Sequence, residues 1–144
     1  MAIHLACCAL GISHAVAVTP QQVVLADNAT GERGKALLAG LVPARTDWED
    51  VAKAIEIHRR ALLAAPAARR VLVVLHDGYP NDAEHVRHLC AQRSPVEVIG
   101  VLLDPDPGTR AAMTGIFGER LIACGASELP RTLGALLRAL AGRR

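Results

Sequence analysis

The aliphatic run VLVVL at residues 71–75 has no polar residue in it. A strand with one face in water would alternate apolar and polar side chains. The run therefore predicts a strand buried on both faces, as in a parallel sheet covered by helices. Two more β-rich runs follow, at 96–104 and 120–124. Asp77 and Asp104 stand where the first two runs end, at the edge where open α/β sheets carry their binding sites.

Amphipathic helical patterns separate these runs. Apolar residues recur at helical spacing in four segments, which gives the order α-β-α-β-α-β-α from residue 48 onward. Strict alternation of this kind predicts a Rossmann-like, three-layer αβα fold with a mostly parallel sheet, and we expect one domain over residues 1–144. Upstream, the patterns predict strands and one further helix. The four helical segments are 48–63, 83–93, 107–117 and 129–140, and the upstream elements are strands at 3–10, 14–18 and 21–27 and a helix at 31–41.

Composition and charge exclude several classes of function. The formal net charge is +2, and the basic pairs have no aromatic residues interleaved for base stacking, so we expect no nucleic-acid partner. The four cysteines show no zinc-site spacing. No apolar stretch approaches the roughly 20 residues of a membrane span, and no secretory leader is evident. These features predict a reduced, cytoplasmic protein with no membrane partner.

Three stretches resemble the von Willebrand factor A (VWA) domain family. They are RTDWEDVAKAI (45–55), RRVLVVLHDGYPND (69–82) and IFGERLIACGASELPRTLGALLRAL (116–140). Among VWA proteins the chain is most similar to bacterial or phage members that partner MoxR-type AAA+ ATPases, or to the chelatase-type subunits. The resemblance implies a metal-ion-dependent adhesion site. By matching, Thr46 and Asp77 would hold Mg²⁺ (or Mn²⁺), a hard cation that prefers oxygen ligands.

The sequence departs from the family pattern at the DxSxS motif. The three serines, Ser13, Ser94 and Ser127, have no aspartate two positions earlier. The run at 3–10 aligns better with the family's second strand than with its first, so the domain looks truncated. Few ligands remain, and we expect the metal to bind weakly or not at all in the isolated chain. Unpaired strand edges would invite a homodimer.

Simpler interpretations of the same residues stay open. Asp77 with Gly78 forms a common turn dipeptide, and Thr46 or Asp47 is a candidate helix cap. His76 is either a catalytic neighbour of Asp77 or a structural histidine. Asp104 and Asp106, with Asp77, allow a metal-dependent phosphoryl-transfer enzyme or a phospho-receiver. Asp106 before Pro107 equally fits a helix cap followed by the first helical residue.

The sequence as a whole favours a non-enzymatic protein-interaction module of VWA type, with an AAA+ ATPase as the expected partner. No motif of a serine hydrolase, a nucleotide-binding loop or a dinucleotide fold occurs. Exposed Tyr79 is the expected contact anchor. The expected binding surface comprises Thr46, Asp47, Asp77, Gly78, Tyr79 and Asn81.

Overall fold

A computed structural model of the chain describes residue 7 and residues 13–18, 23–27 and 50–142. The chain divides into two compact units. One consists of residues 1–47 with 127–144, and the other consists of residues 48–126. This division does not test the expectation of one domain over residues 1–144, which stays a prediction.

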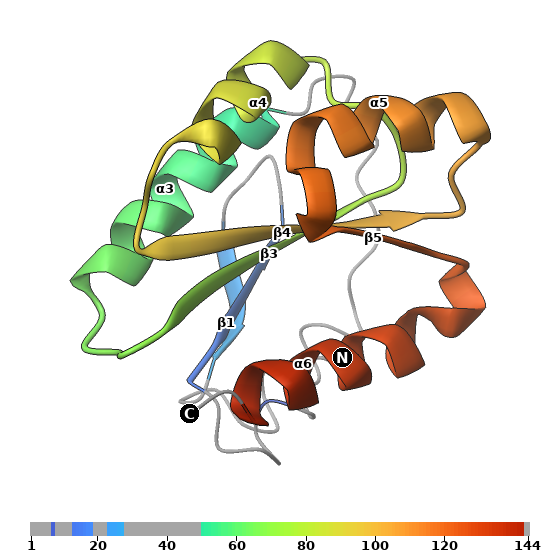
Figure 1. Ribbon diagram of the computed structural model, residues 1–144. Coiled ribbons are helices and arrows are strands. Elements are labelled where there is room, and N and C mark those ends of the chain that lie inside the picture. The colour runs from blue at the N-terminus through green and yellow to red at the C-terminus, as the bar shows by residue number, and fades with distance from the viewer. Residues whose placement is uncertain (1–6, 8–12, 19–22, 28–49, 143–144) are drawn as a thin grey trace. The chain divides into compact units, whose positions relative to one another are not determined.

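The order of elements after residue 50 is the predicted alternation of helices and strands (Figure 1). The predicted strands and helices of this part are confirmed, with ends that shift by a few residues. No described helix has the length and apolar character needed to cross a membrane. The elements are β1 (Ala15–Val18), β2 (Val23–Asp27), α3 (Val51–Ala64), β3 (Arg70–His76), α4 (Ala83–Ala91), β4 (Val96–Leu103), α5 (Pro107–Phe117), η1 (Gly118–Arg120), β5 (Leu121–Cys124), η2 (Ala126–Glu128) and α6 (Leu129–Gly142).

The first unit contains an antiparallel pair of strands and the last helix. Strands β1 and β2 pair from Ala15↔Asp27 to Val18↔Val23, with an irregularity after Val16. They confirm the strands predicted at 14–18 and 21–27. Of the strand predicted at 3–10, the structure describes Cys7, which is buried and helical, so the strand prediction is wrong there. The helix predicted at 31–41 lies outside the described residues.

The second unit is built on a three-stranded parallel sheet in the order β3-β4-β5. Helices α3, α4 and α5 lie on the same face of this sheet (Figure 1). Successive crossovers of one hand between neighbouring strands place their helices on one face in this way. The unit is thus an α/β sheet flanked by helices, compatible with a Rossmann-like fold. The three-layer arrangement stays a prediction.

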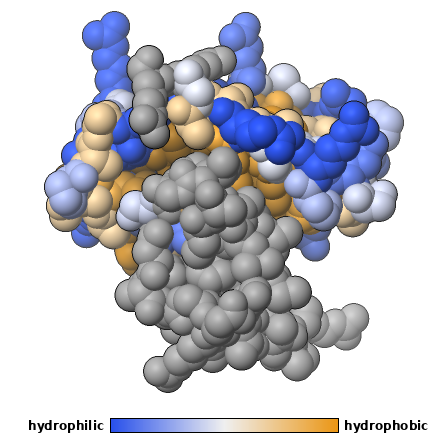
Figure 2. Space-filling model, turned by 90° about the horizontal axis from the view of Figure 1, so that it is seen from below, coloured by the Kyte–Doolittle hydropathy of each residue, from blue (hydrophilic) through white to orange (hydrophobic). Residues whose placement is uncertain are grey.

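The core of this unit lies between strand β4 and the three helices. Side chains of a strand alternate between its faces, so Val98, Gly100 and Leu102 share the face toward the helices. The apolar stripe of each helix packs onto that face. Figure 2, which views the molecule from below, shows the surface of the described residues, with hydrophobic side chains toward the middle and hydrophilic ones along the edge. The buried cluster consists of Val51, Ala52, Ile55, Ala83, Val86, Leu89, Cys90, Val98, Leu102, Met113, Ile116 and Phe117.

Strand β3 is less buried than its sequence predicts. Its residues are half-buried along most of its length, and Leu75 is 39% exposed. Among the described strands β3 pairs only with β4, so one of its flanks has no described strand beside it. Strand β4 pairs on both sides and is the buried strand. A homodimer formed through strand edges stays a prediction.

Gly100 sets the distance between strand β4 and helix α5. A Cβ atom added there would lie 2.8 Å from Cδ2 of Phe117, which is closer than real Cβ contacts. Because Phe117 is itself buried and fixed at the end of α5, the ring has little room to move. The absence of a side chain at residue 100 therefore lets the helix approach the sheet closely.

We expect Gly100→Ala to lower the free energy of unfolding by about 1–3 kcal/mol, because it overpacks the core against Phe117. Urea denaturation measures the change. Gly115→Ala is the control: it lies in α5, the helix that carries Phe117, and its added Cβ would meet no atom within 4 Å. That control should raise stability by about 0.5–1 kcal/mol. A Gly100→Ala protein as stable as the original chain would contradict the packing described here.

Candidate functional site

The loop between β3 and α4, residues 77–82, contains four of the six residues predicted to bind a partner. Asp77, Tyr79 and Asn81 are exposed, and Gly78 is half-buried between the first two. Pro80, in contrast, is almost completely buried. The loop therefore points alternate side chains outward and is anchored at its middle by proline. The other two predicted residues, Thr46 and Asp47, lie outside the described residues.

The start of the loop is fixed by the histidine that ends β3. The backbone N–H of Gly78 donates a hydrogen bond to Nδ1 of His76 at 3.2 Å. His76 thus turns its ring toward the loop backbone and closes the turn after the strand. This contact supports the structural interpretation of His76 over a catalytic pair with Asp77, because Nδ1 is already occupied.

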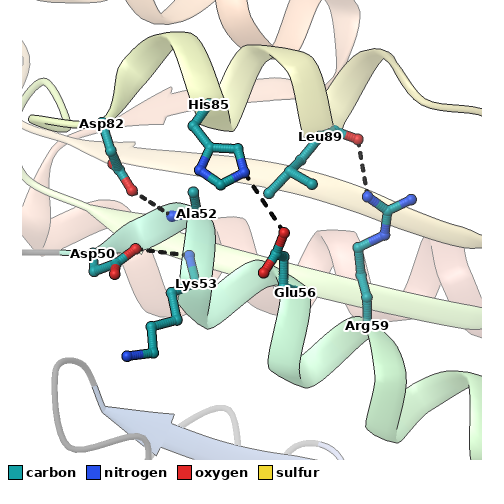
Figure 3. Close-up of polar contacts among 8 residues, drawn as sticks. All are labelled: Asp50, Ala52, Lys53, Glu56, Arg59, Asp82, His85 and Leu89. Atoms are coloured by element: carbon teal, nitrogen blue, oxygen red, sulfur yellow. Dashed lines mark hydrogen bonds and ion pairs between the residues drawn. The ribbon is translucent and has the colours of Figure 1, made fainter.

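The end of the loop is fixed by Asp82, whose carboxylate contacts a different helix (Figure 3). Its Oδ2 accepts a hydrogen bond from the backbone N–H of Ala52, in the first turn of α3, at 2.7 Å. Its backbone carbonyl accepts from His85 and Val86 and so begins α4. Asp82 holds the N-cap position of α4, but its side chain caps α3 instead.

Two more polar contacts join α3 to α4 along the same line (Figure 3). Nε2 of His85 lies 3.6 Å from Oε1 of Glu56, on the exposed side of the helix pair. Deeper in, Nη1 of Arg59 donates to the carbonyl of Leu89 at 3.0 Å. Arg59 is 9% exposed, so this bond satisfies a buried charge at the end of α4. The helix pair is therefore tied at its start, middle and end.

Helix α3 begins later than predicted. Its N-cap is Asp50, whose Oδ1 accepts from the N–H of Lys53 at 2.9 Å. The prediction that Thr46 or Asp47 caps this helix is wrong, because the cap hydrogen bond belongs to Asp50.

Tyr79 has a cation close to it on α4. Glu84, through a hydrogen bond and its charge, holds the pKa of Arg87 above its usual value, and Tyr79 acts in the same direction. The ion pair between Arg87 and Glu84 spans one turn of the helix. The exposed aromatic ring is therefore flanked by a paired arginine, and half of its surface remains open to solvent.

The carboxylates at the end of β4 have structural partners. Asp106 caps α5: its Oδ1 accepts from the N–H groups of Gly108 and Thr109, and its Oδ2 accepts from Oγ1 of Thr109. The bonds from Thr109 lower the pKa of Asp106. Pro107 follows as the first helical residue, and Gly118 ends the helix. The capping interpretation of Asp106 is confirmed.

Asp104 occupies an unusual backbone conformation. Its φ is +44°, in the left-handed region that non-glycine residues seldom adopt. Both carboxylate oxygens lie 3.2 Å from the backbone N of Ala126, and its own N–H donates to the carbonyl of Cys124. Asp104 thus connects the ends of β4 and β5. The phosphoryl-transfer alternative requires this carboxylate, which already accepts a hydrogen bond from the backbone of Ala126.

The described residues do not by themselves fit a divalent cation. Within residues 50–142 and the shorter described segments, no three His, Cys, Asp or Glu side chains gather closely enough to hold a metal. Asp77 is the described member of the predicted pair with Thr46, and one carboxylate leaves most of an octahedral shell to water. The described part of the loop offers surface for contact rather than a closed metal cage.

No protein-family model, curated protein or solved structure matches the chain. The residues and their geometry therefore carry the functional inference, and the VWA resemblance stays a prediction.

We expect Asp82→Ala to lower the free energy of unfolding by about 1–2 kcal/mol, the usual loss for a helix cap. The change should also speed hydrogen exchange of the Ala52 amide, because this N–H loses the carboxylate that accepts its hydrogen bond. Asp50→Ala is the control, since it removes a cap from the same helix but exposes the amide of Lys53 instead. Unchanged protection of Ala52 in Asp82→Ala would show that the carboxylate does not join the two helices.

Proposed function

We propose that this protein is an interaction module that binds a protein partner through the β3–α4 loop. The observation that carries the proposal is Tyr79: its side chain is exposed on a loop whose two ends and middle are fixed by His76, Asp82 and Pro80. Large aromatic residues with a polar tip are enriched among the residues that dominate binding energy at interfaces.

Fixing the loop before binding favours affinity. Association costs free energy for every loop and side chain that must be ordered, and a loop already held in place avoids part of that cost. Asp77 and Asn81 flank the ring with a carboxylate and an amide, which supply hydrogen bonds at the rim of a contact. This arrangement supports partner binding.

The finer parts of the proposal come from the family resemblance. A MoxR-type AAA+ ATPase is the proposed partner, and Thr46 with Asp77 is the proposed contact to Mg²⁺. Because Tyr79 and its exposed neighbours on the loop can contact a partner without any cation, we propose that the cation adds to binding rather than being required for it.

The test is a binding measurement with the MoxR-type ATPases encoded in the same genome, by biolayer interferometry. We expect Tyr79→Ala to weaken binding by about 2 kcal/mol, close to thirtyfold, as for an interface anchor. Leu63→Ala is the control, because Leu63 is 47% exposed and Tyr79 is 46% exposed, but Leu63 lies near the far end of α3. That variant should bind as the original chain does.

The same assay separates the parts of the proposal. Equal binding by Tyr79→Ala and Leu63→Ala would refute the loop as the contact surface, and no binding by the original chain would refute the partner class. Binding that persists in EDTA and is weakened by Asp77→Ala places Asp77 in the contact directly. Complete loss in EDTA would instead make the cation essential, against the proposal.

A further inference from the structure

A second candidate site lies at the opposite rim of the sheet, where the strands begin. A hollow of about 630 Å³ opens between the end of α4, the loop that leads to β4, and the residue that precedes β5. Its lining contains two arginines, one glutamine and one serine, and no carboxylate. The lining residues are Cys90, Ala91, Gln92, Arg93, Ser94, Pro95 and Arg120.

The end of a helix normally carries partial negative charge, which would repel an anion. Here two guanidinium groups neutralise it. Arg59 binds the carbonyl of Leu89, and Nη2 of Arg120 binds the carbonyl of Cys90 at 2.9 Å. Because the hydrogen bond to Cys90 fixes Arg120 on one side, its remaining N–H groups are held in place. The hollow therefore has an excess of positive charge despite its position at a helix end.

The other ionisable and polar groups of the hollow preserve this charge. Burial raises the pKa of the Cys90 thiol, so the thiol stays uncharged at neutral pH. Arg93 is exposed and makes no ion pair with another residue in the described part of the chain. Oγ of Ser94 accepts from the N–H of Val96, which leaves the hydroxyl proton free to donate.

We propose that this hollow binds a phosphate group through Arg93 and Arg120, with Ser94 and Gln92 as neutral donors. A phosphomonoester carries a charge of about −1.5 to −2 at neutral pH, which the two positive charges of Arg93 and Arg120 balance. A carboxylate carries a single negative charge and would leave part of the positive charge unbalanced. Guanidinium also presents paired N–H groups that fit the oxygens of a phosphate. The site is separate from the β3–α4 loop and does not depend on the function proposed for it.

The experiment is an NMR titration of ¹⁵N-labelled full-length protein with inorganic phosphate at constant ionic strength. We expect saturable shifts at the amides of residues 90–94 and 120, and an affinity about tenfold lower in Arg93→Gln, the loss of one charge-assisted hydrogen bond. Arg110→Gln is the control: Arg110 is exposed on α5, outside the hollow, and its loss changes the net charge equally. It should leave the affinity unchanged.

Three results would overturn the proposal. Shifts that fail to saturate or that scatter over the surface would show general charge screening. Equal weakening by Arg93→Gln and Arg110→Gln would show that net charge, rather than the hollow, attracts the anion. Acetate binding as tightly as phosphate would show that the site does not select a doubly charged oxyanion.

Discussion

The carboxylate of Asp82, which begins α4, holds two helices together by binding the N–H of Ala52 in α3, thirty residues earlier in the sequence. Its side chain accepts a hydrogen bond from an N–H in the first turn of α3. Its backbone carbonyl accepts the first hydrogen bonds of α4. The loop that precedes it therefore runs between two fixed points, the end of β3 and the start of the helix pair. Tyr79 is presented on that loop because both of its ends are held.

Charge is sorted between the two rims of the sheet by the direction of the helices. Asp50, Asp82 and Asp106 hold N-cap positions, two of them as caps of their own helices and Asp82 as a cap of its neighbour. Arginines bind carbonyls at the opposite ends: Arg70 contacts those of Leu62 and Ala65 at the end of α3. Both arrangements complement the helix dipole. As a result, the carboxylate caps lie at the rim with the exposed loop, and the arginines that bind helix-end carbonyls lie at the rim with the hollow, where Glu97 also pairs with Arg69.

Local signals in the sequence were enough to predict the strands and α-helices of residues 50–142. The cap and the first-turn proline of α5 were predictable from the sequence, because each acts within a few residues of its own helix. The burial of β3 was overestimated: an aliphatic run predicts a buried strand, but it does not say whether the strand has one neighbour or two. Cys7 shows the same weakness, since a short apolar run fits a helix as well as a strand.

The position of the candidate site was predictable from the sequence, but the hydrogen bonds that hold its loop and helices in place were not. The exposed polar and aromatic residues after β3 stand out in the sequence, because a strand end followed by Asp77 and Gly78 predicts a loop at the sheet edge. The bond from Asp82 to Ala52 depends on how two helices pack, and nothing within a few residues of either encodes it. Arg59 is similar: it lies among charged residues of α3, and its burial follows from the position of α4.

Backbone ¹⁵N relaxation tests the central claim, that the β3–α4 loop is held in place before any partner binds. We expect order parameters of about 0.85 for the amides of Gly78, Tyr79 and Asn81, as in rigid backbone. Values below about 0.6 would contradict it, because a loop that moves on this timescale is not held by His76 and Asp82.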